Sequence, residues 1–207
     1  LIHPSVRIIE HNVIAQKVGA HLNDILQNME DEVLQFSFRE CWEDIQKTKP
    51  DILPFGKIFD EIRDLLFHSK INIVTLNSVS DASQSITEGF NIVIGGNTLG
   101  RGVTFPYLQT VYYSRSAKVP QADTFWQHSR IFGYDREADL VRIYIPESLY
   151  KLFAELNKAN EIIVKQVDAG IDTCQIIYPD NIQPTRKNVL DLNYLNILIG
   201  GVNYFPN

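Results

Sequence analysis

Cysteine is scarce in this sequence, which has only Cys41 and Cys174 among its 207 residues. The two are far apart and neither belongs to a Cys-x-x-Cys pair, so we expect no disulfide framework and a reducing cytoplasm as the compartment. The five histidines show no paired spacing of the kind that binds metal ions. The sequence therefore predicts no structural metal site.

Long apolar runs are also missing, and none reaches the length needed to span a bilayer. The first residues, LIHPSVRIIEHN, lack the pattern of a secretory signal. No segment resembles the phosphate-binding loop G-x-x-x-x-G-K-[ST], and there are no internal repeats. Because the chain starts with a leucine in a strand-like run, we expect it to be a domain of a longer protein.

What is present is enough for one domain with a real core. Apolar residues make up 44% of the chain and aromatic residues 11%. The net charge of −6 argues against a protein coated in nucleic acid, although it leaves room for a local basic patch.

The periodicity of apolar residues predicts alternating strands and helices. Short β-branched runs of the kind found in buried parallel strands alternate with runs at helical spacing. The predicted strands are residues 1–3, 71–76, 92–94, 110–113 and 141–145, and the predicted helices are residues 12–27, 30–47, 55–67, 121–132 and 147–167. Residues 77–85 read as a loop. The order predicts an α/β fold with a parallel sheet flanked by helices.

The stretch from Asn91 to Arg136 combines a strand, a glycine-rich turn, a second strand and a helix. Open parallel sheets bind ligands at the carboxyl ends of their strands, which is where this turn is expected. Glycines let the backbone approach a ligand or another strand closely, and Arg101 and Arg130 could grip phosphate with their rigid guanidinium forks. Arg115 and Lys118 follow a strand end, where contact with phosphate and a solvated loop are both open.

Two motifs in this stretch, GGNTLGRGVTF at residues 95–105 and QHSRIFGY at residues 127–134, resemble the Z-one domain, a bacterial family labelled as an endonuclease. Further similar runs lie at residues 1–5, 76–80 and 184–188, so the resemblance covers nearly the whole chain. The family in turn is similar to the C-terminal RecA-like lobe of superfamily 2 helicases. That likeness implies a three-layer RecA-like lobe over residues 1–170, with an irregular extension over residues 171–207 packed on it.

The helicase resemblance implies a role for each matching residue. Arg130 would be the arginine finger that reaches the γ-phosphate, with Arg136 as a second catalytic arginine. The nucleotide would be bound by Gly100, Gly102, Gln127 and Arg130. Nucleic-acid backbone would be bound by Asn97, Thr98 and Arg101, together with Arg115 from its place after a strand.

His128 stands where the helicase motif has its first arginine, and it reads as a packed helix residue more readily than as a catalyst. Arg136 lies among Asp135, Glu137 and Asp139, so a local ion pair is an equal alternative to the catalytic role. Phe125, Trp126 and Phe132 are expected in the core.

The implied partners are ATP with Mg²⁺, an N-terminal RecA-like lobe that holds the Mg²⁺ ligands, DNA, and other subunits of a bacterial defence system. The chain alone would be inactive, and the whole protein would be an ATP-hydrolysing helicase associated with endonuclease activity, not attached to a membrane. Two alternatives remain open. One is a RecA-like docking domain without catalysis, which would show an apolar surface patch. The other is a nuclease domain, for which Asp51, Lys57, Asp60 and Glu61 lie close in sequence without a suitable strand.

Overall fold

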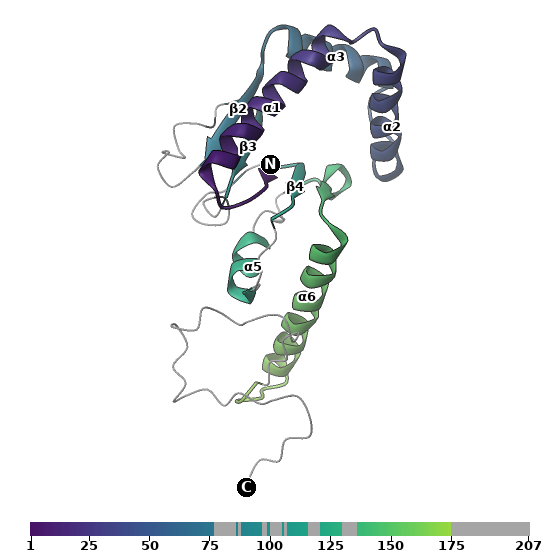
Figure 1. Ribbon diagram of the computed structural model, residues 1–207. Helices are drawn as coiled ribbons and strands as arrows, with labels where there is room; N and C mark the ends of the chain where they lie inside the picture. Colours follow the sequence, from purple (N-terminus) through teal and green to yellow (C-terminus); the bar gives the residue numbers. More distant parts are fainter. Residues whose placement is uncertain are drawn as a thin grey trace.

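The computed structural model describes residues 1–76, 86, 88–96, 99, 105, 107–115, 121–129 and 136–174 (Figure 1). Its centre is a five-stranded parallel sheet in the order β2-β3-β1-β4-β5. The strands are β1 (Ile2–His3), β2 (Ile71–Leu76), β3 (Phe90–Gly95), β4 (Thr110–Tyr113) and β5 (Arg142–Tyr144). The shortest strand, β1, lies in the middle, and its two residues pair with both β3 and β4.

One face of the sheet is covered by helices α1 (Ile8–Gln27) and α3 (Phe55–Phe67). The inward residues of these helices pack with Ile71 of β2 around a buried cluster of Met29, Phe59 and Leu66. Helix α2 (Glu32–Thr48) begins at Asp31, whose side chain accepts a hydrogen bond from the backbone N–H of Leu34. This N-cap satisfies one of the free N–H groups of the first turn.

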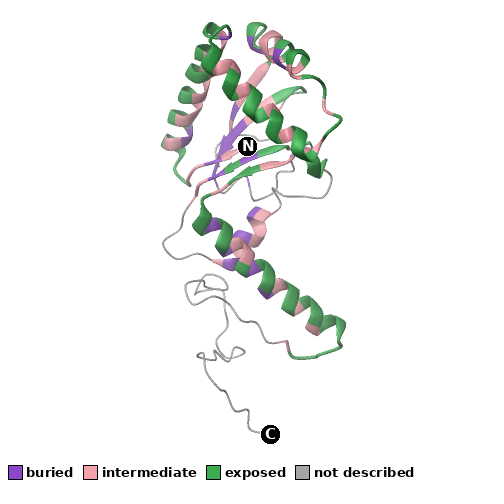
Figure 2. Cartoon of the chain, turned by 90° about the vertical axis from the view of Figure 1, so that its right-hand side faces the viewer, coloured by how far each residue is buried: buried purple, intermediate pink, exposed green. Residues whose placement is uncertain are grey.

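The other face is covered by α5 (Ala122–His128) and by the first half of α6 (Glu147–Asp168). Alternate residues of the strands point to this side, because successive side chains of a strand face opposite ways. The resulting core is the larger of the two and contains residues from β2, β3 and β4, together with Leu1, which precedes β1. Figure 2 shows buried residues along the sheet and on the helices that cover it. Its buried members include Val74, Leu76, Val111, Tyr113, Phe125, Leu149, Leu152 and Leu156.

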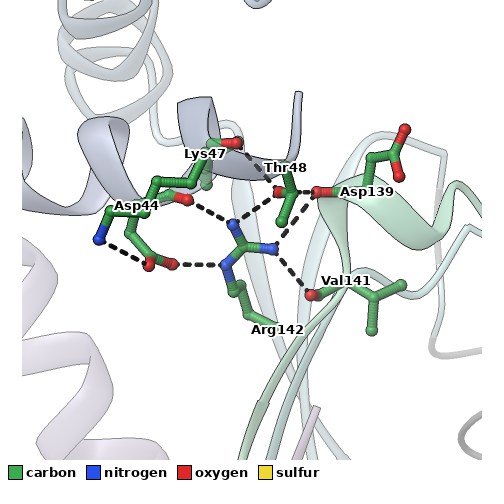
Figure 3. A network of polar contacts seen from close by, with 7 residues as sticks. Asp44, Lys47, Thr48, Asp139, Val141 and Arg142 are labelled. Atoms are coloured by element: carbon green, nitrogen blue, oxygen red, sulfur yellow. Dashed lines mark hydrogen bonds and ion pairs between the residues drawn. The ribbon is translucent and has the colours of Figure 1, made fainter. Parts of the chain in front are cut away.

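Arg142 of the edge strand β5 makes most of the polar contacts that join the end of α2 to the sheet (Figure 3). Arg142 of β5 donates to the Asp44 carboxylate at 2.7 Å, to the Asp44 carbonyl oxygen at 2.8 Å and to Thr48 Oγ1 at 2.9 Å. It also donates to the carbonyl oxygens of Asp139 and Val141, at 3.3 and 3.0 Å. The hydrogen bond from Arg142 holds the pKa of Asp44 below its usual range. We call this set of contacts the Arg142 clamp.

The predicted α/β fold with a parallel sheet between helices is confirmed, and the predicted helix at residues 55–67 matches α3. Helix α1 starts at Ile8 rather than at residue 12, and β3 is longer than predicted at both ends. Strand β5 is shorter, because Pro146 already forms the N-cap of α6. The predicted loop at 77–85, the end of the helix predicted at 121–132 and most of the extension at 171–207 lie outside the described residues.

None of the helices within the described ranges is both long enough and apolar enough to cross a membrane.

Candidate functional site

The carboxyl ends of the three central strands meet at one edge of the sheet. Residue Ile2 is in register with Ile94 of β3, and His3 is in register with Tyr113 of β4. The ends of these strands therefore place His3, Tyr113 and the Gly95-Gly96 pair next to one another. This is the edge at which parallel α/β sheets bind ligands, as the sequence predicts.

Gly95 and Gly96 are required by close packing within the protein. A Cβ on Gly95 would lie 2.6 Å from the carbonyl oxygen of Leu76. A Cβ on Gly96 would lie 2.9 Å from the carbonyl oxygen of Ser5 and 3.1 Å from Cε1 of His11. His11 is itself fixed there, since its Nε2 lies 2.9 Å from the same Ser5 oxygen. The sequence left open whether these glycines approach another part of the backbone or a ligand. In the described residues they approach the protein's own backbone.

A chain of polar contacts runs through the interior at this edge. Tyr113 Oη lies 2.7 Å from Nδ1 of His128, and Nη1 of Arg115 lies 3.3 Å from Nε2 of the same histidine. Tyr113 and His128 are buried, and Arg115 is half-buried. His128 belongs to α5, so these contacts join the end of β4 to that helix. We call these three residues the Tyr113 relay.

His3 packs against the relay from β1. Its ring centroid is 4.8 Å from the ring of Tyr113 and 4.8 Å from the ring of His128. The side chain is fully buried, and within the described part of the chain neither ring nitrogen has a hydrogen-bond partner. Burial lowers the pKa of His3 to about 3, assisted by the positive charge of the nearby Arg115. Burial likewise raises the pKa of Tyr113 to about 12.

Arg136 connects the two motifs of the sequence. Its Nη2 donates to the carbonyl oxygen of Phe105 at 3.2 Å. Phe105 is the last residue of the glycine-rich motif and is buried, whereas Arg136 follows the QHSRIFGY motif. The neighbouring Glu137 pairs with Lys49 at 3.2 Å. Arg136 thus has a backbone contact that neither the catalytic reading nor the ion-pair reading anticipated.

The structure brings together only part of the predicted site. Gln127, half-buried on α5, and Arg115, after β4, lie on the two elements that the Tyr113 relay joins. His128 is buried, in agreement with its reading as a packed residue, and Phe125 and Trp126 pack in or against the core. The remaining predicted residues lie outside the described ranges: Asn97, Thr98, Gly100, Arg101, Gly102, Lys118, Arg130 and Phe132.

His3 and Tyr113 were not predicted as site residues from the sequence. Both could have been found because each is a polar or amphipathic side chain at the carboxyl end of a buried strand, the position at which ligand contacts are most common. The period-two pattern that buries Val111 also buries Tyr113, so its hydroxyl was certain to need an internal partner.

A metal-dependent nuclease centre has no counterpart in the described ranges, where no group of three or more His, Cys, Asp or Glu side chains could hold a metal ion. Asp60, one of the acidic residues close in sequence, is instead 3.7 Å from Arg63 on the same helix. The described part of the chain therefore provides no set of converging carboxylates of the kind that binds Mg²⁺.

An apolar pocket of about 260 Å³ lies between α5, β5 and α6. Its lining consists of Phe125, Trp126, Ser129, Ile143, Ile145, Tyr150, Phe153, Leu156 and Asn157. Polar groups are few there, so the pocket suits an apolar side chain better than a nucleotide.

Comparison with known proteins gives one finding. A family model, described as the Z1 domain, matches residues 1–186. Neither the curated proteins nor the solved structures contain a match to this chain.

Proposed function

The chain belongs to the Z1 domain family, and we propose that it serves as the C-terminal, RecA-like lobe of an ATP-dependent helicase or translocase module in a bacterial restriction or defence protein. ATP and Mg²⁺ would be held mainly by an N-terminal lobe. This lobe would present Arg130 to the γ-phosphate and contact the nucleic-acid backbone through Asn97, Thr98, Arg101 and Arg115. DNA is the proposed nucleic acid.

The observation that carries this proposal is the attachment of α5 to the carboxyl end of β4 through Tyr113 and His128. Gln127 and Arg130 are the residues proposed to meet the nucleotide, and they flank His128 in sequence. Arg115, proposed to meet nucleic acid, touches the same histidine. One buried contact therefore supports a lobe in which both functions are fixed to one sheet edge.

A second observation supports the same arrangement. The hydrogen bond from Arg136 to the Phe105 carbonyl joins the end of the first motif to a residue that follows the second motif. A lobe that must close on ATP needs its phosphate-binding and strand-binding segments to move together, and such a bond between buried and half-buried groups resists their separation. Arg136 thus takes a positioning role in this proposal, and Arg130 keeps the role of arginine finger.

DNA-stimulated ATPase activity tests the proposal, measured on the longest natural protein that contains this chain. An arginine finger stabilises the charge that spreads over the transferring phosphoryl group, so Arg130→Ala should lower kcat by about 10³-fold or more. Arg63→Ala is the matched control, because Arg63 is a half-exposed arginine on α3 that pairs with Glu30 and Asp60. The control should keep wild-type kcat.

Wild-type ATPase that is indifferent to Arg130→Ala would remove the finger role from Arg130. Absence of ATPase in the wild-type protein would refute the motor and favour the second candidate, a docking domain without catalysis. The apolar pocket between α5, β5 and α6 is the observation that favours docking. In that case Trp126→Ala, which removes part of the pocket wall, should weaken association with a partner subunit while Arg130→Ala leaves it unchanged.

A further inference from the structure

In the Tyr113 relay, the guanidinium of Arg115 contacts a ring nitrogen of His128. A guanidinium can only donate, so the contact between Arg115 Nη1 and His128 Nε2 is a hydrogen bond when that nitrogen carries a lone pair. The proton of the neutral imidazole then sits on Nδ1, which donates to Tyr113 Oη at 2.7 Å. This tautomer satisfies both contacts at once.

His128 is held in place from several sides. Its ring lies 4.8 Å from the ring of His3 and 5.8 Å from the ring of Tyr113, centroid to centroid. His128 is 2% exposed and His3 is fully buried. A ring enclosed in this way has one accessible rotamer, and its Nε2 therefore offers the lone pair in one fixed direction.

The fixed direction of the Nε2 lone pair matters for Arg115, because an arginine side chain has many rotamers. A long cationic side chain loses rotamer entropy when a ligand fixes it, and a hydrogen bond formed beforehand reduces that loss on binding. Arg115 follows β4 at the ligand-binding edge of the sheet. The shared chemistry of the ligands expected there is phosphate, from nucleic-acid backbone or from a nucleotide.

We infer that His128 is a positioning residue for Arg115, and that it orients the guanidinium to bind a backbone phosphate of single-stranded DNA. Nucleic acid is favoured over the nucleotide because Arg115 follows β4, whereas Gln127 and Arg130, the side chains proposed to meet the nucleotide, belong to α5 or follow it in sequence. This inference rests on the proposed function. In this inference His128 orients the ligand-binding Arg115, which is a role distinct from catalysis and from packing.

The test measures binding of a fluorescein-labelled oligo-dT by the longest natural protein that contains this chain, over a range of salt concentrations. Each phosphate contact contributes about 0.7 to the slope of log K against log salt for a single strand. Arg115→Gln should reduce the slope by about that amount and weaken binding roughly fivefold to tenfold at 0.1 M salt. His128→Phe should do the same, because it keeps a ring and removes the acceptor.

Two further variants separate positioning from folding. His128→Gln offers an oxygen near the place of Nε2 and should restore most of the wild-type slope. Tyr113→Phe keeps the packing of the ring and removes only the acceptor for Nδ1, so it should reproduce a partial loss even where His128→Phe fails to fold. The double variant Arg115→Gln with His128→Phe should bind as Arg115→Gln does.

A wild-type slope in His128→Phe or in Arg115→Gln would overturn the inference, as would failure of the wild-type protein to bind the oligonucleotide. If Arg115→Gln raises the KM for ATP without changing the salt slope of DNA binding, Arg115 belongs to the nucleotide site. That result would also overturn the inference. The proposed function fails on a different readout, the ATPase activity and its dependence on Arg130. Failure of the inference can therefore be distinguished from failure of the proposed function.

Discussion

At the residue scale, the burial of His3 makes the free energy of unfolding depend on pH. The folded-state pKa of about 3 lies below the ordinary value of 6.5. Below pH 6.5 the unfolded chain binds a proton that the folded chain does not, so protonation favours unfolding. The contribution of His3 is complete above about pH 6.5 and is lost progressively as the pH falls toward 3.

We predict that the free energy of unfolding falls by about 2 kcal/mol more in the wild type than in His3→Phe between pH 7 and pH 5. Urea unfolding at the two pH values measures this difference. His21→Asn is the control variant, because it removes an exposed histidine of α1 instead of a buried one. Equal pH dependence in wild type and His3→Phe would contradict the burial of a neutral imidazole.

Gly95 provides the second prediction at this scale. The Cβ of an alanine would lie 2.6 Å from the Leu76 carbonyl oxygen, and this atom is backbone of the neighbouring strand that cannot move aside cheaply. We expect Gly95→Ala to lower the free energy of unfolding by about 1–3 kcal/mol. Thermal or urea unfolding checks the value.

Gly56 is the matched control for Gly95. It lies in the first turn of α3, and a Cβ there would meet no atom within 4 Å. Gly56→Ala should leave stability unchanged or raise it by up to about 1 kcal/mol, since alanine restricts the unfolded chain. A Gly95→Ala protein as stable as the Gly56→Ala protein would show that the strands can separate to admit a methyl group.

At the scale of elements, the Arg142 clamp holds the end of α2 against β5, together with a hydrogen bond from Thr48 to the Asp139 carbonyl oxygen and the Lys49–Glu137 ion pair. The Arg142 side chain is 17% exposed and has five hydrogen bonds, three of them to Asp44 and Thr48 of α2. Elsewhere α2 packs on α3, where Phe38 meets Phe59 edge to face. The clamp therefore adds a polar attachment at one end of a helix whose apolar contacts lie along one side.

We predict that Arg142→Met raises amide hydrogen exchange in the last two turns of α2 about tenfold, because those turns then open without unfolding of the sheet. Exchange in β2 and β3 should stay at the wild-type rate. Arg7→Met is the control, since Arg7 is exposed and pairs only with nearby Glu10 among the contacts described. Unchanged exchange at residues 44–48 would mean that packing on α3 and the remaining contacts of Thr48 and Lys49 suffice to hold the helix.

At the scale of the whole molecule, the sheet separates two apolar clusters, one on each face. Each face holds one of the two tryptophans. Trp42 lies near Phe55 and donates to the Leu53 carbonyl oxygen at 2.9 Å, whereas Trp126 packs against the larger cluster. Because β2 contributes side chains to both clusters, the two layers share the strands that hold them.

We predict that the chain unfolds in one cooperative transition. Two single-tryptophan proteins, Trp42→Phe and Trp126→Phe, each leave one fluorescent reporter, on opposite faces of the sheet. In urea, the fluorescence midpoint of each protein should coincide with its own midpoint measured by circular dichroism. A lower midpoint for the Trp42 reporter than for circular dichroism would show that the α2–α3 layer opens first.

The sequence was sufficient for the elements with the longest regular patterns. Helix α3 and the strands Ile71–Leu76 and Thr110–Tyr113 follow directly from apolar spacing, which reports the face that each residue presents to the core. The start of α1 was missed by four residues, because Ile8 and Ile9 are exposed and so carry no periodic signal at the helix end. The role of Arg142 could not be predicted, since Asp44 and Thr48 lie far from it in sequence.

The sequence by itself determined the α/β class, the family motifs and the absence of paired cysteines, because periodicity and short motifs are local properties of the chain. Only the tertiary structure decided that β1 lies between β3 and β4 and that His3, Tyr113, Arg115 and His128 meet. These residues come from three separate elements, and parallel strands are joined through distant crossovers. Which side chains share a sheet edge therefore depends on strand order, a property of the packed molecule.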